Sequence, residues 1–408
     1  MKINFVVMIE LYNIIKRSLT NNNLGNISNL FTGIKAFIIT LINYQKNAQT
    51  SGDIANFHWE LAKSKHTPVV VLEGLTCDED LKVREKIAEN FNISNYTLKK
   101  LSHDESANVR KRVAKNPNCP FEVLEQFIYD REKRVRIKVA RNPKALDIIL
   151  EKLAKDDENK VREGVAFNPN TPYNILSKLA KDNENMVREK VARNPNTPYH
   201  ILSELAEDDE DRVREGVARN LNIPYYINIL EKLAVDKKNV RAKIAGNPNT
   251  PYHILKKLTN DEKYIVRVGV AFNPNTSVEL LKQLVDDKKL VREGVAGNPN
   301  TSFDILQKLA HDEDHNVRAS VARNPKTLYP LLDELADDEH YEVRKNVARN
   351  FNTAIETLDY LANDKNDSVR GRVARNHKTS AKTLEKLSND ANENIKKTVS
   401  RNHRFKSK

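Results

Sequence analysis

A short phrase of residues recurs along this chain at a nearly constant spacing. Thirteen copies of Val-Arg-x-x-Val-Ala-x-Asn, or close variants of it, begin between Val83 and Ile395, about 26 residues apart. A period of roughly 20–50 residues is typical of solenoids, in which each unit buries its apolar face only against its neighbours. A worn copy that starts at Phe57 brings the total to about fourteen units. Because such an array grows along one axis, its length does not require a division into compact domains.

Each unit is predicted to contain two short helices. Thr171 and Pro172 are residue types favoured at an N-cap and at the first helical position, and the apolar residues within 175–180 fall on one helical face. A second helix is predicted over 161–166 and ends before Pro169, because proline disfavours helical geometry in the residue before it. No stretch reads as a strand. The expected fold is therefore an all-α solenoid of about fourteen two-helix repeats of about 26 residues.

The two ends of the chain differ from the repeats. Residues 1–56 do not repeat and are predicted to form a helical cap, the array is expected over 57–403, and a basic tail over 404–408. The formal net charge of +12 lies mostly at these ends. Residues 1–56 contain five Lys and Arg against two acidic residues, and the last thirteen residues contain six against none. The repeats themselves are close to neutral, so the net charge does not by itself indicate nucleic-acid binding.

Two other features bear on the cellular location. No run of about eighteen apolar residues occurs, so no membrane span is predicted, and the first residues lack the pattern of a secretory signal. The two cysteines, Cys77 and Cys119, stand apart from each other. This excludes a disulfide framework and fits a reducing compartment, so we expect a cytoplasmic protein.

Three polar positions are nearly constant when the repeats are aligned: one Asp, one Arg and one Asn per unit. On a helical wheel at about 100° per residue, Arg162 falls inside the apolar arc that Val161 and Val165 define. A charge in that place requires a partner and hydrogen bonds. The Asp, about six residues upstream, can cap the second helix and pair with the Arg, and the Asn can satisfy backbone groups at the turn. We therefore predict a structural ladder, represented in two successive units by Asp182, Arg188, Asn194, Asp208, Arg214 and Asn220.

The phrase Val-Arg-x-x-Val-Ala-x-Asn-Pro-Asn-Thr-Pro resembles the leucine-rich repeat variant family, and the Asp and Arg spacing is similar to HEAT-like repeats. The resemblance covers roughly residues 57–403. It implies a right-handed superhelix of α/α or α/3₁₀ repeats with a concave binding face. A member of the family carries an iron–sulfur cluster on a cysteine-rich N-terminal segment. Residues 1–56 contain no cysteine, and such clusters require about four thiolates, so no iron–sulfur cluster is expected.

The residues that vary between repeats are the better candidates for recognition. The position before the fixed Asn points away from the core on the helical wheel and is basic in eight of thirteen units. Acidic neighbours accompany several of these in the middle of the array, but not near the C-terminus. The candidate partner-binding residues are Lys115, Arg323, Lys345, Arg349, Arg372, Arg375, Lys397 and Arg401, together with the aromatic residues Phe167 and Phe272.

Two functions are consistent with this surface. The first is a non-catalytic scaffold that binds a protein partner along a concave face. The alternative is nucleic-acid binding through the basic C-terminal end of the groove. An ordinary solvated face also remains open. No phosphate loop, nucleophile elbow or metal-ligand spacing occurs, so we expect neither enzyme activity nor a cofactor or metal.

Overall fold

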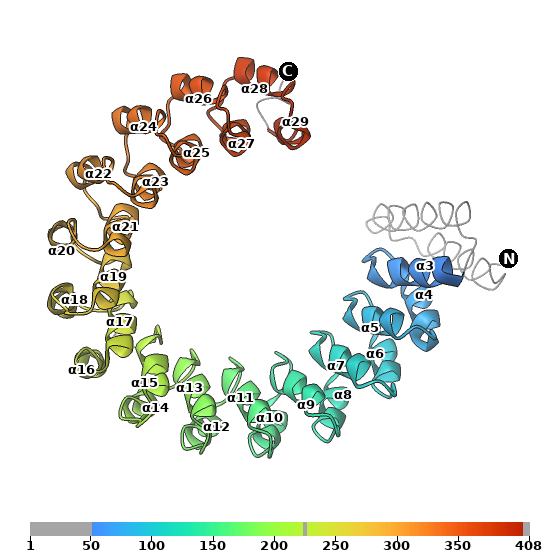
Figure 1. Ribbon diagram of the computed structural model, residues 1–408. Helices are drawn as coiled ribbons and strands as arrows, with labels where there is room; N and C mark the ends of the chain where they lie inside the picture. The colour runs from blue at the N-terminus through green and yellow to red at the C-terminus, as the bar shows by residue number, and fades with distance from the viewer. Residues whose placement is uncertain (1–50, 223–226, 403–408) are drawn as a thin grey trace, which may run out of the picture. The chain divides into compact units, whose positions relative to one another are not determined.

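The computed structural model describes residues 51–222 and 227–402, and in these residues all regular structure is helical. The predicted helical cap lies mostly in residues 1–50, and the predicted basic tail lies at 404–408, outside the described ranges. The chain divides into two units of contact, residues 1–198 and 199–408. In both, a shorter first helix alternates with a longer second helix (Figure 1).

The helices of unit 1 follow this alternation from residue 51 onward. The second helices are α3 (Ser51–Lys63), α5 (Leu81–Glu89), α7 (Ala107–Lys115), α9 (Lys133–Ala140), α11 (Asn159–Phe167) and α13 (Asn185–Arg193). The first helices are α4 (Val69–Gly74), α6 (Asn95–Leu101), α8 (Phe121–Phe127), α10 (Asp147–Leu153) and α12 (Tyr173–Leu179). A 3₁₀ helix, η2 (Leu75–Cys77), follows α4, and the predicted start of the array at residue 57 falls inside α3.

Unit 2 continues the same order. Its first helices are α14 (Tyr199–Leu205), α16 (Ile227–Leu233), α18 (Tyr252–Thr259), α20 (Val278–Gln283), α22 (Phe303–Leu309), α24 (Tyr329–Leu335), α26 (Ile355–Leu361) and α28 (Ala381–Leu387). Its second helices are α15 (Asp211–Ala218), α17 (Lys238–Gly246), α19 (Tyr264–Phe272), α21 (Lys289–Gly297), α23 (His315–Arg323), α25 (Tyr341–Arg349), α27 (Asp367–Arg375) and α29 (Glu393–Val399). The second helices are α-helical throughout the described residues, which settles the α/α or α/3₁₀ alternative left open by the resemblance.

The core consists of the same positions in each repeat. In α11 the residues Val161, Val165 and Ala166 are fully buried, and Ile175 and Leu176 of α12 are at most 1% exposed. Each such aliphatic side chain stabilises the fold by about 1.5–3 kcal/mol relative to an exposed one. Within each unit, the closest contacts between helices of different repeats are those between successive second helices. Within each unit the second helices therefore form one packed layer and the first helices another beside it (Figure 1).

The structure corrects the predicted start of the first helix. In α12 the N-cap residue is Pro172, not Thr171, and the helix begins at Tyr173. Thr171 is 2% exposed and its Oγ1 donates a hydrogen bond to the carbonyl of Val165 at 2.6 Å. The threonine therefore closes the turn after the second helix instead of capping the next one. Serine replaces this proline at Ser380, and there its hydroxyl does cap the first helix by accepting the N–H of Thr383.

Candidate binding surfaces on the second helices

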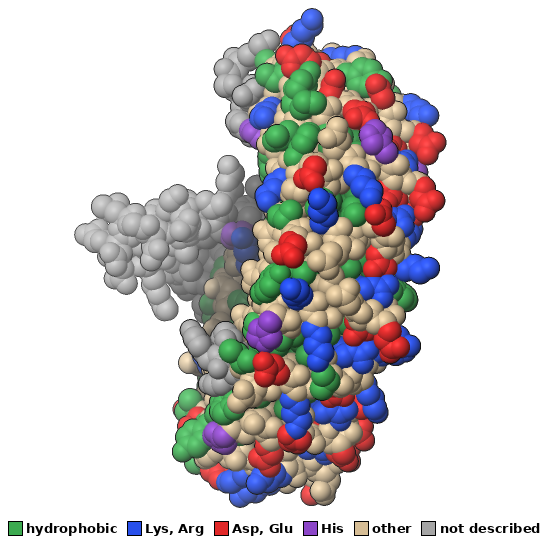
Figure 2. All heavy atoms as spheres, turned by 90° about the vertical axis from the view of Figure 1, so that its left-hand side faces the viewer, with side chains coloured by type: hydrophobic (Ala, Val, Ile, Leu, Met, Phe, Trp, Pro, Cys, Tyr) green, Lys and Arg blue, Asp and Glu red, His purple; other side chains and the backbone are tan. Residues whose placement is uncertain are grey.

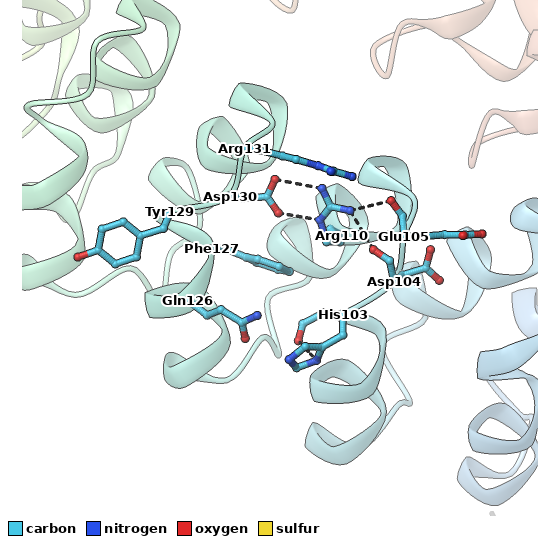
Figure 3. A pocket seen from close by; sticks show the side chains of 10 residues that line it. His103, Asp104, Glu105, Arg110, Gln126, Phe127, Tyr129, Asp130 and Arg131 are labelled. Carbon is cyan, nitrogen blue, oxygen red and sulfur yellow. Dashed lines mark hydrogen bonds and ion pairs between the residues drawn. The ribbon is translucent and has the colours of Figure 1, made fainter.

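The arginine near the start of each second helix joins its own repeat to the next one. Figure 3 shows Arg110 between Asp130 on one side and the loop of Asp104 and Glu105 on the other. Its Nε donates to Asp130 Oδ2 at 2.7 Å and its Nη2 to Asp130 Oδ1 at 3.2 Å, while its Nη1 donates to the backbone carbonyls of Asp104 and Glu105, each at 2.9 Å. Each guanidinium thus bridges its own loop and the carboxylate of the following repeat, as fork-shaped donors are suited to do.

We call this set of contacts the Asp–Arg ladder. Its rungs include the pairs Arg84 with Asp104, Arg110 with Asp130, Arg136 with Asp156, Arg162 with Asp182, Arg214 with Asp236, Arg241 with Asp261, Arg267 with Asp287, Arg292 with Asp312, Arg318 with Asp338, Arg344 with Asp364 and Arg370 with Asp390.

The predicted ladder residues take up these positions. Asp182 accepts from Arg162 Nε at 2.6 Å, Arg188 Nη1 donates to the Asp182 carbonyl at 2.9 Å, and Arg214 Nη1 donates to the Asp208 carbonyl at 2.5 Å. The structure differs from the sequence prediction on capping. The Asp does not occupy the N-cap position. Its Oδ1 instead accepts the N–H of the residue two positions later, as Asp208 does from Glu210 at 3.0 Å, and Glu210 is the N-cap of α15.

Ionisation in the ladder follows from these contacts. The hydrogen bond that Arg110 donates to Asp130 raises the pKa of Arg110 above its ordinary value. In the same way, the hydrogen bond from Arg370 lowers the pKa of Asp390 below its usual range, although burial of the carboxyl acts in the opposite direction. These shifts favour the charged forms of Arg110 and Asp390.

The fixed asparagines form a second ladder, which points in the other direction. Asn194 Nδ2 donates to the carbonyls of Ala166 and Asn168 in the preceding repeat, at 2.7 and 2.9 Å. The amide oxygen stays within its own turn, as Asn220 Oδ1 does when it accepts the N–H of Asn222 at 2.8 Å. These asparagines are buried, and their amides satisfy carbonyls at the C-terminal end of the preceding second helix.

The residue before each fixed Asn is exposed in every repeat from Lys115 to Arg401. In unit 2 this position is arginine in four successive repeats: Arg323, Arg349, Arg375 and Arg401. Within the described part of the chain no carboxylate forms an ion pair with any of the four. We call these four residues the arginine row.

Other candidate residues surround the arginine row. Lys345 is half-buried and pairs with Glu342 at 2.6 Å, so its charge is already balanced. Arg372 is half-buried as well, and its pKa is lowered by burial and by the positive charges of Arg375 and Arg349. Lys397 is exposed on α29.

An aromatic residue adjoins the arginine row. Phe351, in the turn after Asn350, is 72% exposed, and its ring lies 5.4 Å from that of His377 between centroids. The sequence reasoning overlooked Phe351 because proline occupies the same position in most repeats, and only the contrast with that proline could have indicated it.

The two predicted aromatic candidates are exposed but are also tied to neighbouring helices. Phe167 is 58% exposed, and the Arg141 guanidinium lies over its ring at 5.6 Å. Phe272 is 52% exposed and lies against Gly294 of the next second helix, where an added Cβ would come within 2.8 Å of its ring.

A basic cluster in unit 1 surrounds the predicted candidate Lys115. Lys111, Arg112 and Lys115 of α7 border a hollow of about 410 Å³, whose other lining residues are Arg134, Ile137 and Lys138 of α9. Arg134 and Lys138 were not among the predicted candidates. The signal for them is present in the sequence, because neither 107–115 nor 133–141 contains an acidic residue.

The surface over the first helices is different in character. Figure 2 shows Lys and Arg side chains interspersed with Asp and Glu on the face that includes α18, α20 and α22. No large area of one sign stands out in this view. The concentrations of unpaired positive charge described above lie on the second helices.

Metal sites and membrane-spanning helices are two further features to consider in the described residues. No group of three or more His, Cys, Asp or Glu side chains is placed to hold a metal ion in residues 51–222 and 227–402. None of the helices in those ranges is long and apolar enough to cross a membrane.

Comparisons with known proteins add little beyond the fold. No protein-family model matches the chain, and a search of curated proteins found no relative. Among solved structures, the chain is similar to one described as a leucine-rich repeat variant with a novel repetitive structural motif, with 22% identity and a TM-score of 0.38 over 54% of this chain and 87% of the other. An engineered protein matches 88% of this chain and 96% of its own length with 14% identity and a TM-score of 0.25. At these levels neither likeness carries an argument about function, and the helical repeat fold rests on the structure itself.

Proposed function

We propose that this chain is a non-catalytic repeat scaffold of the leucine-rich repeat variant type, which binds an acidic protein partner through the exposed face of its second helices. The observation that carries the proposal is the arginine row: four exposed arginines at one position of successive repeats, each without a carboxylate partner in the described residues. Arginine and aromatic side chains dominate the energetics of many protein interfaces. Arg349, Arg375 and the exposed Phe351 together supply both kinds of contact. A cytoplasmic location, supported by two unpaired cysteines, belongs to the same proposal.

The distribution of charge favours a protein over a nucleic acid. A nucleic-acid groove requires positive charge that follows the phosphate backbone. In unit 2 the exposed position before the fixed Asn is Gly246, Phe272 and Gly297 in the three repeats before Arg323. The arginine row therefore does not continue into the preceding repeats of unit 2, which favours an acidic surface of limited size over a long phosphate backbone.

Retention of partners on the immobilised full chain tests the proposal. The double variant Arg349→Glu and Arg375→Glu should reduce retention of a specific acidic protein at least about tenfold, because reversing charges in an interface costs several kcal/mol. The matched control is Lys365→Glu with Lys382→Glu, which makes the same change of charge at two exposed residues outside the second helices and should leave retention unchanged. Equal losses in both variants would contradict the proposal.

The same material tests the nucleic-acid alternative. Binding of the full chain to duplex and single-stranded oligonucleotides is measured as a function of salt. A steep fall in affinity with salt, lost in the Arg349 and Arg375 double variant, would establish nucleic acid as the ligand of this patch instead. If the partner is a protein, we expect only weak binding to oligonucleotides, and the Arg349 and Arg375 double variant and the Lys365 and Lys382 control should change it equally.

A further inference from the structure

The hollow between α7 and α9 in unit 1 is lined almost entirely by positive charge. Five of its six lining residues are basic, namely Lys111, Arg112, Lys115, Arg134 and Lys138, and the sixth is Ile137. No acidic residue lines it. Positive charges this close together repel one another. The repulsion must be offset by stabilising contacts elsewhere in the fold or by a bound anion.

The partners of these residues leave most of the charge unbalanced. Arg112 binds the carboxylates of Glu85 and Glu89 on α5. The Lys111 ammonium donates to the side-chain oxygen of Asn108 at 3.1 Å, which is neutral. In the described part of the chain, Lys111, Lys115, Arg134 and Lys138 form no ion pair with a carboxylate.

Two further observations indicate that this hollow is suited to an anion. Arg112 Nε is buried and donates no hydrogen bond within the described residues, which is rare for a buried polar group. Lys138 is half-buried, and its pKa is lowered by burial first and then by the positive charges of Arg141, Lys115, Lys111 and Arg112. A bound anion would remove this repulsion and accept hydrogen bonds from the same side chains.

We propose that this hollow binds a small ligand that carries two or more phosphate groups. Arginine and lysine together are the usual partners of phosphate oxygens, and five basic side chains match more than one phosphate charge. The volume of about 410 Å³ is in the range of small-molecule sites.

The limits of the positive area indicate a small ligand and not a long polyanion. On one side lie Glu85 and Glu89 of α5, and on the other the second helices α11 and α13 carry Glu163 and Glu189. A second hollow shares Arg112 and Lys115, but there Lys63 and Lys86 already pair with Glu60 and Glu89. On the α5 side, where Glu85 and Glu89 are partly exposed, an extended phosphate backbone would meet carboxylates.

Calorimetric titration of the full chain with inorganic tripolyphosphate tests the site. The double variant Arg134→Gln with Lys138→Gln should weaken binding at least about tenfold, because it removes two positive charges and their charge-assisted hydrogen bonds to phosphate. The control Lys133→Gln with Lys152→Gln removes two charges nearby, from residues that do not line the hollow, and should change the affinity less than about twofold. Helical circular dichroism should be unchanged in both, because no ladder residue is altered.

Further arms identify the source of the phosphates. Binding to neutral lipid vesicles is compared with and without a lipid that carries a phosphorylated inositol headgroup, which distinguishes a membrane-borne ligand from a free one. If the chain binds the vesicles with this lipid and tripolyphosphate displaces it, the site is supported and the headgroup is the source of the phosphates. The proposal is overturned if tripolyphosphate fails to bind at low salt, if both double variants lose affinity equally, or if only oligonucleotides bind. None of these outcomes depends on the arginine row, so the experiments can contradict the phosphate site without contradicting the proposed function, and the reverse.

Discussion

Each arginine of the Asp–Arg ladder has partners in two different repeats, and this explains why the residue is constant. Arg344 Nε donates to Asp364 Oδ2 of the next repeat at 2.6 Å, while its Nη1 donates to the Asp338 carbonyl of its own repeat at 2.7 Å. Its side chain is only 8% exposed. A buried charge is tolerated only with such saturation of its donors. An arginine can therefore lie in the same apolar arc of the helix as Val and Ala without leaving an unpaired charge in the core.

Acid should weaken the ladder in a defined pH range. The hydrogen bond from Arg370 lowers the pKa of Asp390, so the ion pair stabilises the fold fully above the ordinary Asp pKa of about 3.9. This stabilisation is lost as the pH falls below that value and through the lowered pKa of the folded state. Asp390→Asn should therefore cost about 1.5–3 kcal/mol at pH 7, and less as the pH falls below about 4. Urea unfolding of both proteins between pH 7 and pH 2.5 measures the difference.

The control for this experiment is Glu356→Gln, at an exposed residue of α26 outside the ladder. It should shift the unfolding midpoint little at any pH, as surface substitutions usually do. A cost of Asp390→Asn that stays constant down to pH 2.5 would contradict the assigned ionisation.

At the level of helices, glycine at one position allows two successive second helices to approach each other closely. Gly269 of α19 lies against α17: a Cβ built on it would be 2.7 Å from Ala245 Cβ and 2.8 Å from the Ala242 carbonyl oxygen. Backbone atoms cannot move aside as a flexible side chain can. Gly269 is therefore a contact point between two successive second helices.

A pair of glycine substitutions tests this packing. Gly269→Ala should destabilise the protein by about 1–3 kcal/mol, because it overpacks the contact between α17 and α19. Gly371→Ala, where the nearest atom to the added Cβ is Ile395 Cγ1 at 3.8 Å, should stabilise it by about 0.5–1 kcal/mol through helix propensity. Thermal unfolding followed by circular dichroism compares the two, and equal effects of the same sign would rule out the packing argument.

The fold was predictable at this scale, and the binding surface only in part. The repeat spacing and the apolar positions such as Val161 and Val165 are local signals, so they predict the helices and the solenoid. The role of Thr171 was misread because Thr-Pro is an N-terminal signal in isolated helices, whereas here the hydroxyl bonds back to Val165. Lys138 was missed for a different reason: a wheel drawn for one helix does not show which residues the neighbouring helix brings to the same hollow.

Across the whole molecule, stability should be distributed along the array and not shared by one core. The contacts between repeats link neighbours only, and such proteins behave as chains of coupled units. Trp59, the single tryptophan of the chain, lies in α3, where Lys63 and Lys86 stand over its ring at 4.7 and 5.9 Å. Its fluorescence therefore reports on the contact between α3 and α5, while circular dichroism reports on all helices.

Urea titration followed by both signals should give two transitions that do not coincide. The tryptophan transition should come at a lower urea concentration, because α3 lies at one end of the described repeats and has a repeat neighbour among them on one side only. Superimposable curves with one midpoint would indicate a single cooperative unit and contradict the prediction.

Both ladders connect adjacent repeats only: each arginine binds the following repeat, and each asparagine binds the preceding one. Within the described residues, these contacts therefore do not depend on the total number of repeats. Excision of residues 299–324 would join Asn298 to Pro325. Arg292 would then meet Asp338 in place of Asp312, and Asn350 would reach Ala296 and Asn298, the carbonyls that Asn324 now binds. Duplication or loss of a repeat in the gene can therefore change the number of repeats without breaking either ladder. It would also change the distance between the proposed ligand sites.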